Sequence, residues 1–108
     1  MTSIVDNLEK LLSDGQDNAL LRYSLGNAYL EIDAAIATQH LEQALSFDPN
    51  YSAAWKLLGK ARTQDGNQVG AIDAYERGLE VAEKNGDVQA MKEMRVFLKR
   101  LRKTTANR

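Results

Sequence analysis

Few residues in this 108-residue chain have the types that catalysis or metal binding requires. His40 is the only histidine, and the sequence contains no cysteine. A zinc site usually takes histidine or cysteine ligands, so a site at His40 would have to be completed by carboxylates alone. A serine hydrolase would also have to use His40, but no Gly-x-Ser-x-Gly elbow is present. We therefore interpret His40 as an ordinary helix residue.

Two further patterns resemble catalytic or nucleotide-binding features but have simpler explanations. Glu76, Glu80 and Glu83 share one face at helical spacing, which is typical of a solvated helix. The stretch DGNQVGAID at residues 65–73 lacks the Lys-Ser/Thr pair of a phosphate-binding loop and follows an expected helix instead of a strand. We therefore expect a protein that is not an enzyme and that binds no cofactor or metal ion.

The charges are unevenly distributed, although the net charge is only −1. Residues 1–87 contain seven Lys/Arg and fourteen Asp/Glu, whereas residues 88–108 contain seven Lys/Arg and one Glu. A basic tail can contact nucleic acid or an acidic partner, or it can simply place cations at a helix C-terminus. The sequence shows no signal-peptide pattern and no apolar run near the roughly 20 residues that span a bilayer. We expect no membrane contact and a soluble, cytoplasmic protein.

Apolar residues recur with helical periodicity, and short breaks rich in Gly, Asp and Asn interrupt them. Pro49 must end a helix, Gly66 suits a left-handed C-terminal cap, and Asp87 suits an N-cap. These breaks predict helices over about 3–13, 18–32, 34–47, 52–64, 68–84 and, after Asp87, up to about 103. The short connections predict that successive helices run antiparallel.

A repeat of 33–34 residues underlies these helices. The pattern L-G-x-A occurs at residues 25–28 and again at 58–61. A second match, at an offset of 34, pairs Ala37 with Ala71, Leu41 with Tyr75, and Ala44 with Gly78. The segment L-E-x-L-L at 8–12 matches L-E-x-A-L at 41–45. The first helix therefore looks like the second half of a unit whose first half is missing.

These positions resemble the signature of the tetratricopeptide repeat (TPR) family, a helix-turn-helix unit of about 34 residues. The repeat-motif residues are Leu25, Gly26, Ala37, Ala44, Pro49, Trp55, Leu58, Gly59, Ala71, Tyr75 and Gly78. Arg22, Arg62 and Glu83 depart from the family pattern, which has tryptophan, tyrosine and proline at those places. The resemblance implies an all-α fold: a right-handed α-solenoid of antiparallel helix pairs with about six helices.

We expect a single TPR-like domain over residues 1–108. It would comprise an N-terminal half-unit (1–17), a first repeat (18–50), a second repeat (51–85) and a C-terminal capping helix with a basic tail (86–108). A hairpin of this kind cannot bury its apolar face alone, so its neighbours must stack on it and the ends need caps.

The resemblance also implies a non-catalytic scaffold, in which the first helix of each unit lines a concave groove that holds a protein or peptide segment. Spacing within the helices proposes the groove residues Leu20, Tyr23, Asn27 and Leu30 in the first unit and Lys56, Lys60 and Thr63 in the second. One apolar wall and one basic wall would suit a partner with aliphatic and acidic residues. In the alternative, Leu20 and Leu30 are buried against the N-terminal helix and the lysines are solvated.

The last helix carries Met91, Met94, Leu98 and Leu101 at 3-4-3 spacing, with Phe97 beside them. This stripe predicts packing on the fifth helix as a cap, but methionine-rich stripes also bind partners, so a homo-oligomer through this helix is an alternative. A different function, binding of nucleic acid or an acidic partner, would use the basic residues of 92–108. Nucleic acid is the less favoured partner, because Phe97 is the segment's only aromatic residue for base stacking.

Overall fold

The computed structural model describes residues 3–106. Residues 1–2 and 107–108, which belong to the expected N-terminal half-unit and basic tail, lie outside the described residues. The described chain contains six helices and no strand: α1 (Ile4–Ser13), α2 (Ala19–Tyr29), α3 (Ala34–Phe47), α4 (Ser52–Gln64), α5 (Gln68–Asn85) and α6 (Val88–Ala106). The predicted all-α fold is confirmed. Within the described range, no helix is long and apolar enough to cross a membrane.

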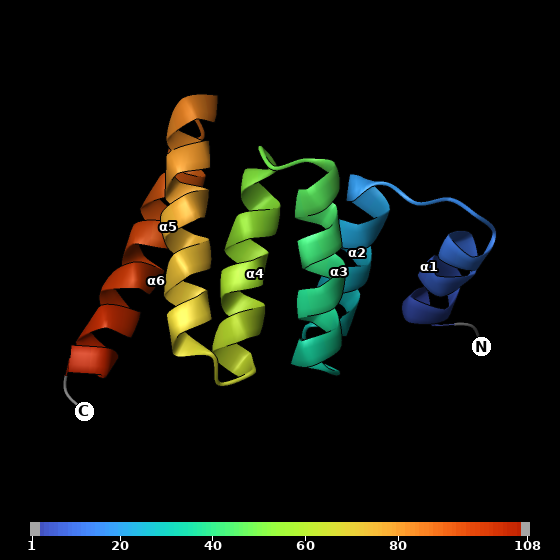
Figure 1. Ribbon diagram of the computed structural model, residues 1–108, viewed down its shortest axis with the longest axis horizontal. Coiled ribbons are helices and arrows are strands. Elements are labelled where there is room, and N and C mark those ends of the chain that lie inside the picture. The colour runs from blue at the N-terminus through green and yellow to red at the C-terminus, as the bar shows by residue number, and fades with distance from the viewer. Residues whose placement is uncertain (1–2, 107–108) are drawn as a thin grey trace.

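The helices follow one another along the longest axis of the molecule (Figure 1). Helices α2 and α3 form one antiparallel pair, α4 and α5 form the next, and α6 packs on α5. The chain thus builds an α-solenoid with principal extents of 45 × 31 × 21 Å. Helix α1 lies at the opposite end from α6 and packs mainly on α2.

Polar side chains at the helix starts set several boundaries. Asn18, Asp33 and Asn67 accept hydrogen bonds from backbone N–H groups in the first turns of α2, α3 and α5. Asp87 accepts from the N–H of Ala90 at 3.1 Å, which confirms the predicted cap of α6. Gly66 has φ 79°, so the left-handed backbone predicted there is also confirmed.

The second helix is shorter than predicted. It ends at Tyr29, whereas the periodicity suggested Ile32. Asp33 is extended, with φ −155° and ψ 98°, and its carboxylate caps the N-terminus of α3. The chain must therefore leave α2 before Asp33, and residues 30–32 form a turn in which the N–H groups of Ile32 and Asp33 both bond to the carbonyl of Tyr29.

Three glycines allow the helices to approach closely. A Cβ atom added at Gly26 would lie 2.5 Å from Leu41 Cγ, and one at Gly59 would overlap the Tyr75 ring. A Cβ at Gly78 would lie 2.6 Å from the sulfur of Met94. Real Cβ contacts are longer than this, so a larger residue at any of these positions would displace a neighbouring side chain. The glycines predicted to sit inside helices are therefore the points where a neighbouring helix is packed most tightly.

The core consists of small and large apolar side chains from successive helices. The largest fully buried side chains are Tyr75, Leu25, Leu41, Leu58 and Met94. Most of the repeat-motif residues are buried, and the exceptions are Pro49, which is exposed, and Trp55, which is half-buried. The indole N–H of Trp55 donates to the carbonyl of Pro49 at 2.9 Å, so these two motif residues contact each other at the surface.

Helix α1 is held less firmly than the others, because none of its residues is buried. Its polar link to the body is Glu9, which accepts a hydrogen bond from the hydroxyl of Tyr29 and lies 3.6 Å from His40 Nε2. Ile4 remains 68% exposed.

Candidate functional site

Helix α4 contacts both α2 and α6, so these three helices share one face of the molecule. Tyr23 of α2 stacks on Tyr51, which precedes α4, with ring centroids 5.0 Å apart. Lys60 of α4 lies over the ring of Phe97 in α6, at 5.3 Å from its centroid. We call this surface the α2–α4–α6 face; it carries the predicted groove residues of both units.

The residues predicted on α2 form the less polar part of this face. Leu20 is 66% exposed and Asn27 is exposed, while Tyr23 and Leu30 are half-buried against the core. The alternative in which Leu20 is buried against the N-terminal helix is therefore wrong. An exposed leucine, a half-buried tyrosine and an amide remain available to a partner on this helix.

Lys56 does not contribute a free positive charge. Its ammonium group is 2.5 Å from Glu93 Oε2 on α6. The hydrogen bond from Lys56, with a second from Gln89, holds the pKa of Glu93 below its ordinary value. The wall predicted to carry two cations therefore has one of them neutralised by the last helix, and the sequence analysis had not identified Glu93 as its partner.

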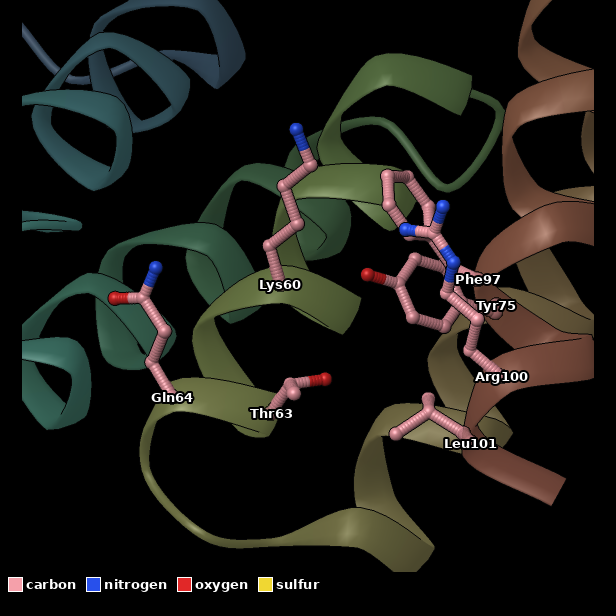
Figure 2. Close-up of a pocket in the computed structure, with 7 residues that line it drawn as sticks. All are labelled: Lys60, Thr63, Gln64, Tyr75, Phe97, Arg100 and Leu101. Atoms are coloured by element: carbon pink, nitrogen blue, oxygen red, sulfur yellow. The ribbon is translucent and has the colours of Figure 1, made fainter. Parts of the chain in front are cut away.

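Lys60 and Thr63, the other predicted residues of α4, line a pocket between α4 and α6 (Figure 2). This α4–α6 pocket has a volume of about 280 Å³, and its other lining residues are Gln64, Tyr75, Phe97, Arg100 and Leu101. Tyr75 forms the floor, and its hydroxyl points toward Lys60 and Thr63. Among the described residues, neither Lys60 nor Arg100 forms an ion pair.

Tyr75 is the residue of the pocket whose pKa is clearly shifted. Burial raises the pKa of Tyr75 to about 12, although a hydrogen bond with the Thr63 side chain acts in the opposite direction. The hydroxyl therefore stays protonated at neutral pH and can donate a hydrogen bond. Thr63 itself donates to the carbonyl of Gly59 at 2.8 Å.

Sequence reasoning found the α4 side of this pocket but not the α6 side. Phe97 and Arg100 lie three residues apart and therefore on one side of a helix. The sequence analysis assigned the basic residues of 92–108 to a separate function and did not place these two residues against α4. The structure brings Lys60 and Thr63 together with them. The predicted residues Leu20, Tyr23, Asn27 and Leu30 do not line this pocket.

His40 belongs to a contact network that joins α1, α2 and α3. The guanidinium of Arg22 donates to His40 Nδ1 at 3.1 Å and pairs with Asp17 at 2.7 Å. Burial, followed by the charge of Arg22, lowers the pKa of His40. Within residues 3–106 there is no group of three His, Cys, Asp or Glu side chains placed to hold a metal ion. Arg22, which departs from the repeat pattern, thus has a packing role.

Arg62, the second departure, also bridges helices. Its guanidinium donates to the carbonyl of Gly70 at 2.9 Å and lies 3.5 Å from Glu42. Arg62 therefore links α4 to α5 and α3 where the family pattern has a tyrosine.

Helical-repeat binding proteins are α-solenoids of repeated antiparallel helix pairs, in which side chains of successive helices line one face. The chain is 52% identical over 99 residues to a TPR repeat-containing protein of Pseudomonas aeruginosa, a match that covers 91% of this chain and 94% of that protein. The chain belongs to the TPR family. A co-chaperone of heat-shock protein cognate from Aspergillus fumigatus is 48% identical over 56 residues, which is 52% of this chain but only 16% of that protein. No family model matches the chain.

Solved structures agree with this assignment. A Bordetella parapertussis protein, determined in solution, superimposes with a TM-score of 0.86 and 47% identity over 98% of this chain and 93% of that one. The Sgt2 TPR domain of Aspergillus fumigatus gives a TM-score of 0.79 and 32% identity over 94% of this chain and 66% of that one. The family resemblance seen in the sequence is confirmed, and the chain is accordingly a protein-interaction module.

Proposed function

We propose that this module binds an extended segment of a partner protein along the α2–α4–α6 face and that it has no catalytic activity. The contact residues we propose are Leu20, Tyr23, Asn27 and Leu30 on α2 and Lys56, Lys60 and Thr63 on α4. The observation that carries the proposal is the run of side chains from the exposed Leu20, through the Tyr23–Tyr51 stack, to the α4–α6 pocket. Repeat proteins use such extended faces for binding.

The partner we propose has aliphatic and acidic residues. The α2 part of the face offers apolar and amide groups, and the α4–α6 end offers the cations Lys60 and Arg100. Similarity to a co-chaperone over part of the chain also favours a protein partner. The location in the cytoplasm and the division into a half-unit (1–17), two repeats (18–50 and 51–85) and a capping helix (86–108) are part of this proposal.

The alternative, binding of nucleic acid or an acidic partner through the outer side of α6, has less support. Lys92, Arg95 and Lys99 are exposed there. However, Phe97 is stacked on Tyr75 with centroids 5.4 Å apart and is half-buried, so it is not free to stack on a base. Steeply salt-dependent binding to random oligonucleotides would favour this alternative.

Selection of peptides from a random display library tests the main proposal. We expect the immobilised chain to enrich a sequence family whose binding is lost in Tyr23→Ala and Lys60→Glu. Lys84→Glu, at an exposed residue near the end of α5, is the control for a change of charge. Enriched peptides that bind both groove variants as well as they bind the unchanged chain would show that the α2–α4–α6 face is not the binding surface.

A further inference from the structure

The α4–α6 pocket has the size of a side-chain site. Its volume of about 280 Å³ lies below the range of about 300–1,000 Å³ in which proteins bind whole small molecules. It is open on the α2–α4–α6 face, where a partner segment would lie. A pocket of this size at one end of a longer face fits one anchoring residue of a bound segment better than it fits a cofactor.

The walls and floor of the pocket are mainly apolar. The Tyr75 ring is 2% exposed and stacks on Phe97, and Leu101 lies beside them. Burial of an apolar side chain here would be favourable, because it removes apolar surface from water. The lining therefore selects an aromatic or aliphatic anchor.

The edge of the pocket is positively charged. Lys60 and Arg100 come from the two facing helices and, in the described part of the chain, have no carboxylate partner. The ammonium group of Lys60 lies over the Phe97 ring, where a cation–π interaction favours its position at the pocket. By contrast, Glu93 neutralises Lys56 one turn earlier on α4. Unlike Lys56, Lys60 and Arg100 therefore form no ion pair within the described residues.

We propose that the α4–α6 pocket anchors an apolar side chain of a partner protein that carries a carboxylate next to it, with Lys60 and Arg100 binding the carboxylate. This inference rests on the proposed function and specifies its chemistry. The carboxylate we assign is an Asp or Glu side chain, because the proposed partner is an extended segment with acidic residues. The basic end of this chain itself has the wrong charge for the site.

Titration of the isotope-labelled chain with short peptides, followed by NMR, tests the inference because it detects millimolar binding. One pair of probes is the blocked hexapeptide Gly-Ser-Phe-Glu-Gly-Ser and its Gln counterpart. A second pair is Gly-Ser-Gly-Ser-Phe with a free or an amidated C-terminus. We expect the shifts to centre on Lys60, Phe97 and Arg100, and the Glu peptide of the first pair to bind about ten- to a hundredfold more tightly than its Gln counterpart, as expected for a charge-assisted hydrogen bond. A preference for the charged peptide in the second pair alone would overturn the assignment to a side chain and would make the C-terminus of the partner the source of the carboxylate.

A matched pair of variants distinguishes the effect of a positive charge at the pocket from that of a positive charge elsewhere on α6. Arg100→Met should reduce the preference for the charged peptide, because only Lys60 then remains to bind the carboxylate. Lys92→Met, which removes one charge from an exposed position of the same helix, should retain the full preference. Equal binding of charged and neutral peptides in both pairs, or an equal effect of the two variants, would overturn the inference. Shifts confined to Tyr23 and Asn27 would overturn the pocket assignment but support the groove; no shifts anywhere at millimolar peptide would contradict both.

Discussion

At the scale of single residues, glycines within the helices allow neighbouring helices to approach closely. Gly59 is buried in the middle of α4, where glycine costs about 1 kcal/mol relative to alanine in an isolated helix. In the fold, the ring of Tyr75 occupies the space that a Cβ at this position would take. The glycine is thus required by its neighbour, and the same ring forms the floor of the α4–α6 pocket.

We predict that Gly59→Ala destabilises the protein by about 1–3 kcal/mol, because the added methyl group must displace the Tyr75 ring. At a helix position without a close neighbour, the same change stabilises by about 0.4–1 kcal/mol. Urea unfolding therefore tests the prediction by the sign of the effect. A stabilised variant would show that Tyr75 does not pack on Gly59.

Titration of Tyr75 should make the protein less stable at high pH. Its pKa is about 12 in the folded chain and near its ordinary value of 10 once unfolded, so the native state holds the proton more tightly. The unfolding free energy should therefore fall between pH 10 and 12, with a contribution from this group of roughly 2–3 kcal/mol. Urea unfolding across this range should show a shallower decline in Tyr75→Phe. An identical decline in both proteins would refute the assignment.

At the scale of elements, α6 closes the stack through its apolar stripe. Met94, Leu98 and Leu101 are buried, and Met94 contacts Gly78 of α5. Its outer side is charged, and Arg95 and Lys99 are exposed. One helix thus covers the last apolar face and also supplies Phe97 and Arg100 to the pocket. Loosening α6 should consequently affect both stability and binding.

Met94→Ala should destabilise the protein by about 2–5 kcal/mol, since it removes a fully buried side chain and leaves a cavity against Gly78. Met91→Ala is the matched control on the same helix, where the side chain is half-buried and a smaller loss is expected. Chemical unfolding monitored by circular dichroism measures both. Equal losses would contradict the packing of Met94 as the central contact of α6.

At the scale of the whole molecule, the repeats produce an elongated body. The radius of gyration of the Cα atoms is 14.2 Å, compared with about 13 Å for a compact domain of this length. The two ends differ in charge, because the Asp- and Glu-rich part of the chain precedes the basic last helix. The α4–α6 pocket lies toward the basic end.

We expect a single chain in solution, with a mass of 12.0 kDa by light scattering. The stripe that could have formed a homo-oligomer is used within the chain, because α6 buries it on α5. Val96 remains 48% exposed but is flanked by the exposed Arg95. A mass of two chains at micromolar concentration would contradict this expectation and would make the outer side of α6 an interface.

The helices, the repeat and the family can all be predicted from the amino-acid sequence, because they depend on local signals. Periodicity, Pro49 and the capping residues act within a few positions along the chain, and the pairs of small residues recur at the spacing of one unit. The end of α2 was misplaced, since the cap at Asp33 interrupts an apolar pattern that continues to Ile32. Helix α6 also continues to Ala106, beyond the predicted end near residue 103.

Which charges lack an ion pair, and where the pocket lies on the α2–α4–α6 face, depend on the tertiary structure. Lys56 and Lys60 are equivalent in the sequence, four residues apart on one helix, yet Glu93 neutralises the first while the second lies over Phe97. Both partners come from α6, more than 30 residues away in the chain. Helical spacing fixes the direction of a side chain, whereas its partner depends on how another helix is packed against it.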